Sequence, residues 1–546
     1  MKNFSSKIGI LLFALIAINY VSTKVYKRFD LTKDKRYTLS ETTKKILESI
    51  DEPTVIEVYL KGDFPAEFKR LQIETKQHLE EIKSINNNIR FKFIEPLDIA
   101  EDLIKQGLQP SRLSVQEGGK VSEAVIFPWA TITYKNKQEN ISLLANQTFS
   151  SQEAQLQNSI ENLEFAFADA IHKVSSEKKQ KIAILKGNGE LADINLVGFL
   201  SKLKAYYKLA PFTLDSVSIN PQKTVKQLTD YDLAIIAKPT QKFTEQEKFT
   251  LDQFITNGGK TLWLIDNVTA ELDSLMLTGQ TLAFNKDLNL TDLLFSYGVR
   301  INYDLVKDIQ SNTIRLASGN SGNQTQYQDF PWHYFPRIIS KNKHAITKNV
   351  EPIRLQFANS IDTLNNGISK EIILQSSPYS KAIGTPSLIK LDEVAKKPTQ
   401  KDYNNGQQTL GILLEGEFIS AYANRIKPFE TKQFIAKSKA NKMVIIADGD
   451  IISNDIVKGS PIDLDIDKYT NFHYGNSAFL MNTINYMLDD TGLMQLRSKT
   501  IQIQFLDKEK AFQERTFWQW LNVVLPLAFL LIFGLLFSYL RKKKYR

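Results

Sequence analysis

The chain contains no cysteine among its 546 residues, and its histidines number only five. Without cysteine there can be no disulfide bond, no thiol nucleophile, no thiol redox chemistry and no lipid anchor on a processed cysteine. The histidines are scattered and show no H-x-x-H or H-E-x-x-H spacing, so the sequence predicts no zinc site. These absences predict a protein that works without a bound metal or other cofactor.

The chain also lacks a complete phosphate loop or nucleophile elbow. Residues 258–261 read Gly-Gly-Lys-Thr, but a Walker A loop requires glycine at the position of Ile255 and a helix after the lysine. Here the pattern predicts the reverse order, a helix that ends at the glycines and a strand that follows. Residues 319–322 begin like G-x-S-x-G, yet Asn323 stands where the last glycine belongs. The sequence therefore predicts no enzymatic activity.

Neither basic stripes nor low-complexity runs occur in the long central part of the chain. The formal charge of +9 is spread over the whole length and partly concentrated beside the apolar segments, so nucleic-acid binding is not indicated. Hydrophobic residues make up 42% of the chain and charged residues 24%. This balance is typical of a folded protein, and the length predicts two or more domains.

Two uncharged apolar segments lie near the ends, at residues 8–23 and 516–540. Roughly 20 apolar residues are needed to cross a bilayer, and the second segment meets that length. It opens with aromatic residues and is followed by the basic residues 541–546. The first segment is shorter, but the long side chains of Lys7 and Lys24 can reach the interface. We expect two spans, with both termini on one side and the body on the other.

Two alternatives remain open for these ends. The first segment also fits a secretory signal peptide, although residues 19–23 offer no small-x-small cleavage site. Basic residues flank both spans on both sides, so their distribution does not favour either orientation.

The residues after the first span predict a small α/β domain. Strands are expected at 55–60 and 89–94, joined by a helix at 67–85. Two further strands, at 124–134 and 139–144, are expected to pair with each other. This order of elements resembles a thioredoxin-like domain.

A long amphipathic helix is predicted next, over residues 151–174. Its apolar residues recur at spacings of three and four and form one stripe. The stripe consists of Leu156, Ile160, Leu163, Phe167, Ile171 and Val174. Two interpretations are open for it, packing between domains and binding of a partner helix.

The second folded region alternates short buried strands with helices. Strands are predicted at 182–185, 232–237, 261–265 and 443–447, with a large insertion at about 267–441. Such alternation predicts a doubly wound parallel sheet.

Ligands of doubly wound sheets bind beyond the carboxyl ends of the strands. Four polar residues are predicted to lie there and are the candidate ligand-binding residues: Asn188, Glu190, Asp266 and Asp448. Lys238 and Asp450 are expected at the same rim. Several carboxylates would repel an anion, so a hydroxyl-rich or cationic ligand, such as a sugar, is the better hypothesis. The alternative is that these are ordinary turn and cap residues.

Four blocks of the sequence carry a family resemblance. Residues 30–40, 185–191, 231–266 and 448–482 follow one another in the order found in the gliding-motility-associated ABC transporter auxiliary proteins, the GldG family. The chain resembles that family over nearly its full length. The resemblance implies a protein of the bacterial inner membrane with its body in the periplasm, and its partners would be an ABC permease subunit and a cytoplasmic ATPase subunit.

The resemblance also implies a fold for the middle domain. That domain is similar to the class I glutamine-amidotransferase-like fold, which an intraflagellar-transport subunit shares. The enzymes with this fold use a cysteine, so a role inherited by this chain would be non-catalytic. The predicted domains are a transmembrane anchor at 1–28, a thioredoxin-like domain at 29–150, a connecting helix at 151–177, an amidotransferase-like domain at 178–490, a juxtamembrane segment at 491–515, a transmembrane helix at 516–540 and a basic tail at 541–546.

The expected function is that of a non-enzymatic, membrane-anchored auxiliary subunit of an ABC transporter associated with gliding motility or export. A structural scaffold of an envelope machine, without a transported substrate, is the alternative. An envelope hydrolase that uses the rim carboxylates is a third hypothesis.

Overall fold

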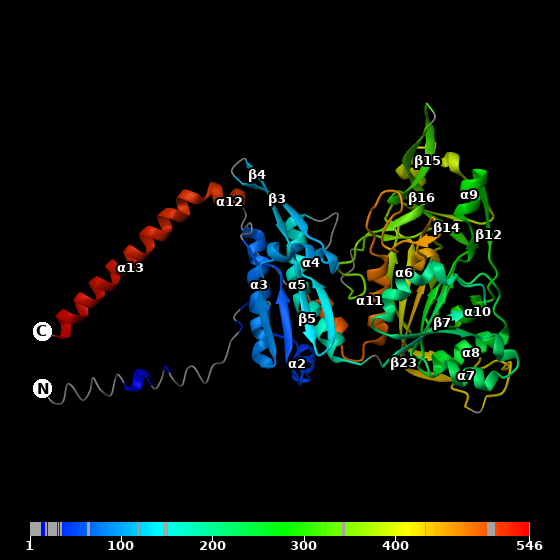
Figure 1. Ribbon diagram of the computed structural model, residues 1–546, viewed down its shortest axis with the longest axis horizontal. Coiled ribbons are helices and arrows are strands. Elements are labelled where there is room, and N and C mark those ends of the chain that lie inside the picture. The colour runs from blue at the N-terminus through cyan, green and yellow to red at the C-terminus, as the bar shows by residue number, and fades with distance from the viewer. Residues whose placement is uncertain are drawn as a thin grey trace. The chain divides into compact units, whose positions relative to one another are not determined.

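The structure, a computed structural model, forms two compact units, residues 1–500 and 501–546 (Figure 1). Nearly all of the predicted first anchor, residues 1–28, lies outside the described residues. The structure describes residues 13–16, 19, 30, 32, 35–62, 66–117, 120–145, 151–177, 179–322, 324–340, 344–431, 433–499 and 508–544.

The first folded part of unit 1 contains a four-stranded sheet in the order β2-β1-β5-β6. Strands β1 and β2 are parallel, and helix α3 connects them in the chain. Strand β5 is antiparallel to both β1 and β6. The elements are α2 Glu41–Glu48, β1 Thr54–Val58, α3 Ala66–Ile85, β2 Ile89–Phe93, α4 Ala100–Lys105, β3 Ser111–Glu117, β4 Lys120–Ile126, β5 Trp129–Tyr134, β6 Lys137–Ser142 and α5 Gln152–Ser175.

The prediction of one continuous strand at 124–134 is wrong. Pro128 lies between β4 and β5, and proline has no backbone N–H with which to continue a ladder. Strand β4 therefore forms a hairpin with β3, and β5 enters the four-stranded sheet.

The second folded part is built on a seven-stranded sheet in the order β19-β22-β23-β10-β9-β7-β8. The five strands from β23 to β8 are parallel, as the alternation of strands and helices predicts. Strand β8 was not predicted. The strands of this seven-stranded sheet and the helices that accompany them are β7 Lys181–Lys186, α6 Asp193–Lys204, β8 Lys208–Thr213, α7 Pro221–Leu228, β9 Leu233–Ala237, α8 Glu245–Thr256, β10 Lys260–Leu264, β19 Ser369–Gln375, β22 Thr409–Ile419, β23 Lys437–Ile446 and α11 Asn476–Leu488.

Alternate residues of these strands point to opposite faces, and both faces are covered. Ile182 and Ile184 of β7 share one buried cluster with residues of α6 and α11. Ala183 and Leu185 share the other with residues of α8 and α10. Burial on both faces explains why the parallel strands read as continuous apolar runs.

The predicted insertion at 267–441 contributes to the sheet. Its strand β22 pairs antiparallel with β23, and β19 pairs antiparallel with β22 at the edge of the sheet; its other strands form small sheets. These other elements are β11 Val268–Thr269, α9 Leu272–Thr278, β12 Gln280–Asn285, α10 Thr291–Ser296, β13 Val299–Ile301, β14 Asp304–Asp308, β15 Ser311–Ser321, β16 Gln324–Ile338, β17 Ile353–Arg354, β18 Ile361–Thr363, β20 Ser380–Gly384 and β21 Ser387–Lys390. After the insertion come β24 Ile456–Val457 and β25 Ser460–Pro461.

The glycines at 258 and 259 end α8, as the sequence predicts. Gly258 has a φ of +98°, which favours glycine, and β10 begins directly afterwards. A Cβ on Gly259 would lie 2.3 Å from the ring of Phe254, so glycine is required there as well. This segment is a helix end and not a phosphate loop.

Unit 2 contains α12, Lys508–Gln513, and α13, Arg515–Lys544. The most apolar window of α13 has a mean hydropathy of 2.5, and the helix ends on four basic residues. It is the one helix among the described residues that is long and apolar enough to cross a membrane.

Candidate functional site

The carboxyl ends of β10 and β23 meet at one edge of the sheet, and two of the predicted site residues follow them. Asp266 and Asp448 are both buried, with 5% and 0% of their surface exposed. Asp266 Oδ1 accepts a hydrogen bond of 2.6 Å from the Gly449 N–H. Asp448 accepts from the N–H groups of Asp450, at 2.7 Å, and Gln356, at 2.5 Å. Backbone donors thus occupy both carboxylates.

Lys238 brings a positive charge to the same edge, directly after β9. Its Nζ lies 2.7 Å from Asp450, 3.7 Å from Asp266 and 4.0 Å from Glu271. The backbone of Lys238 has a φ of +53°, which is uncommon outside glycine. Gly449 packs on it so closely that a Cβ would lie 2.5 Å from Lys238 Cγ. The ammonium group of Lys238 thus lies among these three carboxylates, at the position that a bound cation would otherwise occupy.

Burial dominates the protonation of this cluster. It raises the pKa of Asp266 from 3.8 to about 6, helped by the charge of Asp450 and opposed by Lys238 and Lys286. Burial also raises the pKa of Asp448 well above its ordinary value, with added repulsion from Asp266 and Asp450. Burial alone would lower the pKa of Lys238, but Asp450, Asp266 and Glu271 outweigh it and raise that pKa. These shifts favour a charged Lys238, and they favour the protonated forms of Asp266 and Asp448 over a wider pH range than usual.

A segment of the insertion covers this edge. The Asn359 N–H donates to the Ala447 carbonyl at 2.8 Å, directly beyond β23. Asn359 Oδ1 accepts from the Asn267 N–H at 2.7 Å, and its Nδ2 donates to the Asp304 carbonyl. Together with Gln356 on Asp448, these bonds close the strand ends over Asp266 and Asp448. The sequence could not predict this closure, because the segment has no strand or helix pattern.

The other two predicted residues, Asn188 and Glu190, lie together in the turn after β7. The Asn188 N–H donates to Glu190 Oε2 at 2.8 Å, and Asn188 Nδ2 donates to Glu247 Oε2 at 3.3 Å. Gly187 and Gly189 both have positive φ angles, as a turn this tight requires. Asn188 Oδ1 and Glu190 Oε1 are buried acceptors without a hydrogen-bond donor among the described residues. Burial raises the pKa of Glu190.

The structure places Asn188 and Glu190 in the turn after β7 and places Asp266 and Asp448 at the ends of β10 and β23. No hydrogen bond or ion pair between described residues joins Asn188 or Glu190 to Asp266 or Asp448. The prediction that a ligand binds at the rim remains a prediction. The described part of the chain contains no group of three or more His, Asp or Glu side chains arranged to hold a metal ion.

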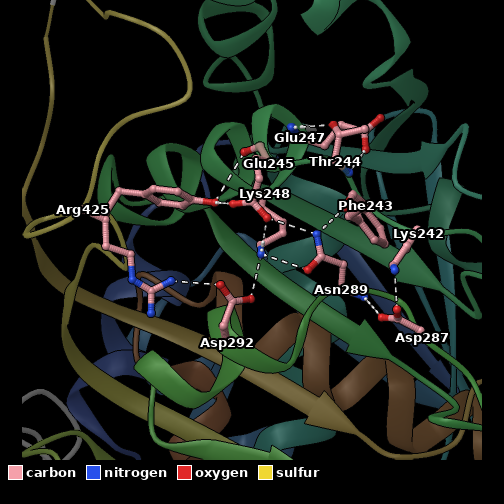
Figure 2. A network of polar contacts seen from close by, with 11 residues as sticks. Lys242, Phe243, Thr244, Glu245, Glu247, Lys248, Asp287, Asn289, Asp292 and Arg425 are labelled. Carbon is pink, nitrogen blue, oxygen red and sulfur yellow. Dashed lines mark hydrogen bonds and ion pairs between the residues drawn. The ribbon is translucent and has the colours of Figure 1, made fainter.

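Glu247 links the Asn188 turn to a larger polar network at the start of α8 (Figure 2). Thr244 caps the helix and exchanges hydrogen bonds with Glu247. One turn on, Lys248 is 1% exposed, and its Nζ donates to Glu245 at 2.8 Å, Asp292 at 2.7 Å and Asn289 at 3.4 Å. Arg425 contacts the other oxygen of Asp292 at 2.9 Å. This buried lysine was not predicted, because a lysine in a polar helix start gives no sign of burial.

The apolar stripe of α5 is buried inside unit 1. Each of the five candidate residues is at most 4% exposed: Leu156, Ile160, Leu163, Phe167 and Ile171. The helix contacts α2, α3, β6 and the 3₁₀ helix η6, Leu493–Ser498. The stripe thus packs against elements of the first folded part and against η6, so a partner helix would have to displace these contacts; both interpretations of the stripe remain predictions.

Two buried glutamates beside the stripe form a polar seam that the sequence did not reveal. Glu161 lies 2.9 Å from Lys348 Nζ, and Glu164 lies 2.9 Å from Lys499 Nζ. Glu164 also accepts from the Ser40 N–H at 2.7 Å and the Thr43 hydroxyl at 2.9 Å. Lys499 outweighs the cost of burial and holds the pKa of Glu164 below its usual range. Through Glu164 the seam joins the described segment 35–62 to the segment 433–499.

The comparisons place the chain in a class of transport proteins. A family model described as "ABC-type uncharacterized transport system" matches residues 179–483, more than half of the chain. The chain belongs to this family of ABC transporter auxiliary proteins. A second model, for a domain of unknown function, matches residues 33–133.

Individual relatives are distant. A protein of Borreliella burgdorferi described as uncharacterized is 22% identical over 537 residues, which cover 96% of this chain and 95% of the relative. Among solved structures, the N-terminal domain of mmIFT52 aligns with 57% of this chain and 99% of its own, at 12% identity and a TM-score of 0.29.

Proposed function

We propose that this protein is a non-enzymatic auxiliary subunit of an ABC transporter of the GldG type, associated with gliding motility or export. Two membrane spans would anchor it to the bacterial inner membrane, with the body in the periplasm. Its partners would be the permease and the cytoplasmic ATPase subunit. The observation that carries the proposal is the family match over residues 179–483, in a chain that also has the apolar helix α13.

Within this proposal the body has two domains of known fold type, a thioredoxin-like domain at 29–150 and an amidotransferase-like, doubly wound domain at 178–490. The order β2-β1-β5-β6, with α3 between the two parallel strands, supports the first. Five parallel strands with helices on both faces support the second. Helix α5 would connect the two domains.

The chemistry of the rim supports a non-enzymatic role. Asp266 and Asp448 accept backbone hydrogen bonds, and Lys238 pairs with Asp450. Because these groups are engaged and covered, they hold the insertion against the sheet. An envelope hydrolase would require at least one such carboxylate to face water.

A ligand of this subunit, if it carries one, would lie at the strand ends. Asn188 and Glu190 each have an acceptor oxygen without a donor among the described residues, and because both oxygens are buried, a ligand would reach them only if the turn opened. Two acceptors fit a ligand rich in hydroxyl groups, such as a glycan. The covered rim favours the second candidate function, a scaffold without a transported substrate.

Purification from the native membrane in a mild detergent, through a tag on this chain, tests the proposal. We expect a permease and an ATPase to co-purify, as identified by mass spectrometry. The matched control replaces residues 516–540 with a polyleucine span of equal length, which keeps the anchor but removes its specific surface. Recovery of other envelope proteins without an ATPase would favour the scaffold.

A further inference from the structure

A long hairpin formed by β15 and β16 stands out from the body of unit 1 (Figure 1). Its strands pair from Ser311 to the turn, where Ser321 lies opposite Gln324. Every residue from Ala317 to Gln328 is exposed, apart from Ser321 and Asn323, whose exposure is not described. Both faces of this part of the ribbon are therefore open to water.

The exposed part of the hairpin carries no charge. Residues 316–328 contain no Asp, Glu, Lys or Arg and no proline, whereas 24% of the whole chain is charged. Charge returns only at the base, where Arg315 and Asp329 form two hydrogen bonds of 2.7 Å with each other. At the average composition about three charged residues would be expected in such a stretch. Uncharged residues continue below this pair, at 311–314 and 330–336, so most of the ribbon is neutral.

The outer edge of β15 also lacks a partner strand. Among the described strands β15 pairs only with β16, so the opposite row of N–H and C=O groups is free to pair. Exposed edges of natural sheets are usually protected by lysine, proline or a very short strand. The small hairpin of β24 and β25 in this chain has all three features, with Lys458 in its turn and Pro461 in a two-residue strand. Strand β15 contains no lysine or proline and is 11 residues long, although its pairing with β16 has two register shifts, between Ser311 and Thr313 and between Ala317 and Gly319. The prolines of the longer hairpin, Pro331 and Pro336, lie in β16.

We propose that the outer edge of β15 pairs antiparallel with the same strand of a second copy of this chain. Two copies that each carry a net charge of +9 meet without like-charge repulsion at the contact when the contacting surface has no charge, and residues 316–328 supply such a surface. An antiparallel pair of identical strands is self-complementary about a two-fold axis, because each N–H meets a C=O of the other copy. A two-stranded ribbon is marginally stable in water, and two paired hairpins make a four-stranded sheet.

Light scattering of the full-length chain in detergent micelles, at protein concentrations from about 1 µM to about 50 µM, measures the mass and so tests this dimer. The wild type should have the mass of two chains. The double variant Ser318→Lys and Asn320→Lys places like charges opposite each other, and should weaken the dimer at least about tenfold. Ser460→Lys, on the exposed β25, is the matched control and should leave the dimer intact.

A second measurement is independent of dimer stability. Because the chain has no cysteine, a single Ser318→Cys variant forms a disulfide only between copies, and mild oxidation should yield a covalent dimer. The same treatment of Ser460→Cys should not. A monomeric wild type across the concentration range, or a dimer that the two lysines leave unchanged, would overturn the proposal. The second result would assign the dimer to another surface.

Discussion

Lys248 is a charged residue inside the protein, and its amine is held by three oxygen atoms. Glu245 and Asp292 supply two of them at 2.8 and 2.7 Å, and Asn289 supplies the third. Lys242 lies nearby in the same network and pairs with Asp287, but both of those side chains are more than half exposed (Figure 2). The two lysines therefore differ in burial within one sequence neighbourhood.

Replacing Lys248 with methionine should lower the free energy of unfolding by about 1–2 kcal/mol, because Glu245 and Asp292 lose their shared cation, although both carboxylates are partly exposed and Asp292 keeps its contact with Arg425. Lys242→Met should cost less than about 1 kcal/mol, because its ion pair is solvated. Urea unfolding of the two variants, followed by tryptophan fluorescence, measures both. Equal losses would show that the network is not the source of the stability.

Asp266 predicts a dependence of stability on pH. Its folded pKa of about 6 lies above the ordinary value of 3.8, so the folded state binds a proton more tightly than the unfolded state. This group therefore favours folding most below about pH 4, and the contribution is lost as the pH rises through about 6. Asp266→Asn removes the dependence while keeping an oxygen for the Gly449 N–H.

Relative to the wild type, Asp266→Asn should gain up to about 3 kcal/mol of stability between pH 4 and pH 7.5. Urea midpoints at several pH values measure the gain. Asp230→Asn removes an exposed carboxylate and controls for the loss of one charge. A constant difference between Asp266→Asn and the wild type at all pH values would contradict the account of this cluster.

At the scale of elements, α5 holds unit 1 together through two kinds of contact. Its apolar stripe is buried, and beside that stripe Glu161 binds Lys348 of the insertion and Glu164 binds Lys499 at the end of the unit. Glu164 also accepts hydrogen bonds from Ser40 and Thr43. One carboxylate therefore connects residues near the start of unit 1 with Lys499 at its end.

Glu164→Ala should therefore lower the free energy of unfolding by about 2–3 kcal/mol, since it leaves the Ser40 N–H without its acceptor and Lys499 without its carboxylate partner. Glu153→Ala, at an exposed position in the first turn of the same helix, should cost under about 1 kcal/mol. Thermal unfolding of the full chain in detergent compares the two. Similar shifts in the unfolding temperature would contradict a special role for Glu164.

The elements that the sequence predicts well are those with strong local signals. The strands at 182–185, 232–237 and 261–265 are continuous apolar runs, and the glycines at 258–259 end α8. Strand β8 escaped prediction because it is an edge strand that contains Pro211 and few fully buried residues. Pro128 does carry a local signal, and it could have divided the strand predicted at 124–134.

The candidate site could be predicted only in part for a related reason. Strand ends locate Asp266 and Asp448 at one edge, because parallel strands end together. That Gln356 and Asn359 cover them depends on the path of the insertion, which no local pattern specifies. The seam at Glu161 and Glu164 likewise depends on lysines that lie far away in the sequence.

At the scale of the whole molecule, two spans would put both termini on one side of the membrane, and the resemblance to the GldG family predicts that this side is the cytoplasm and that the body lies in the periplasm. Reporter fusions that are active only in the cytoplasm should work at both ends. Protease added to spheroplasts should digest the body, and a fusion at Gly459, in an exposed turn, should report the periplasm. Protection of the body from the protease would contradict this topology.

The central claim is that the chain is a subunit of an ABC transporter, and reciprocal purification through a tag on the ATPase tests it most directly. Quantitative mass spectrometry would measure the ratio of this chain to the ATPase and the permease over a range of salt concentrations and detergents. We predict a fixed ratio that persists wherever the permease is retained. An ATPase–permease complex purified intact without this chain would contradict the account.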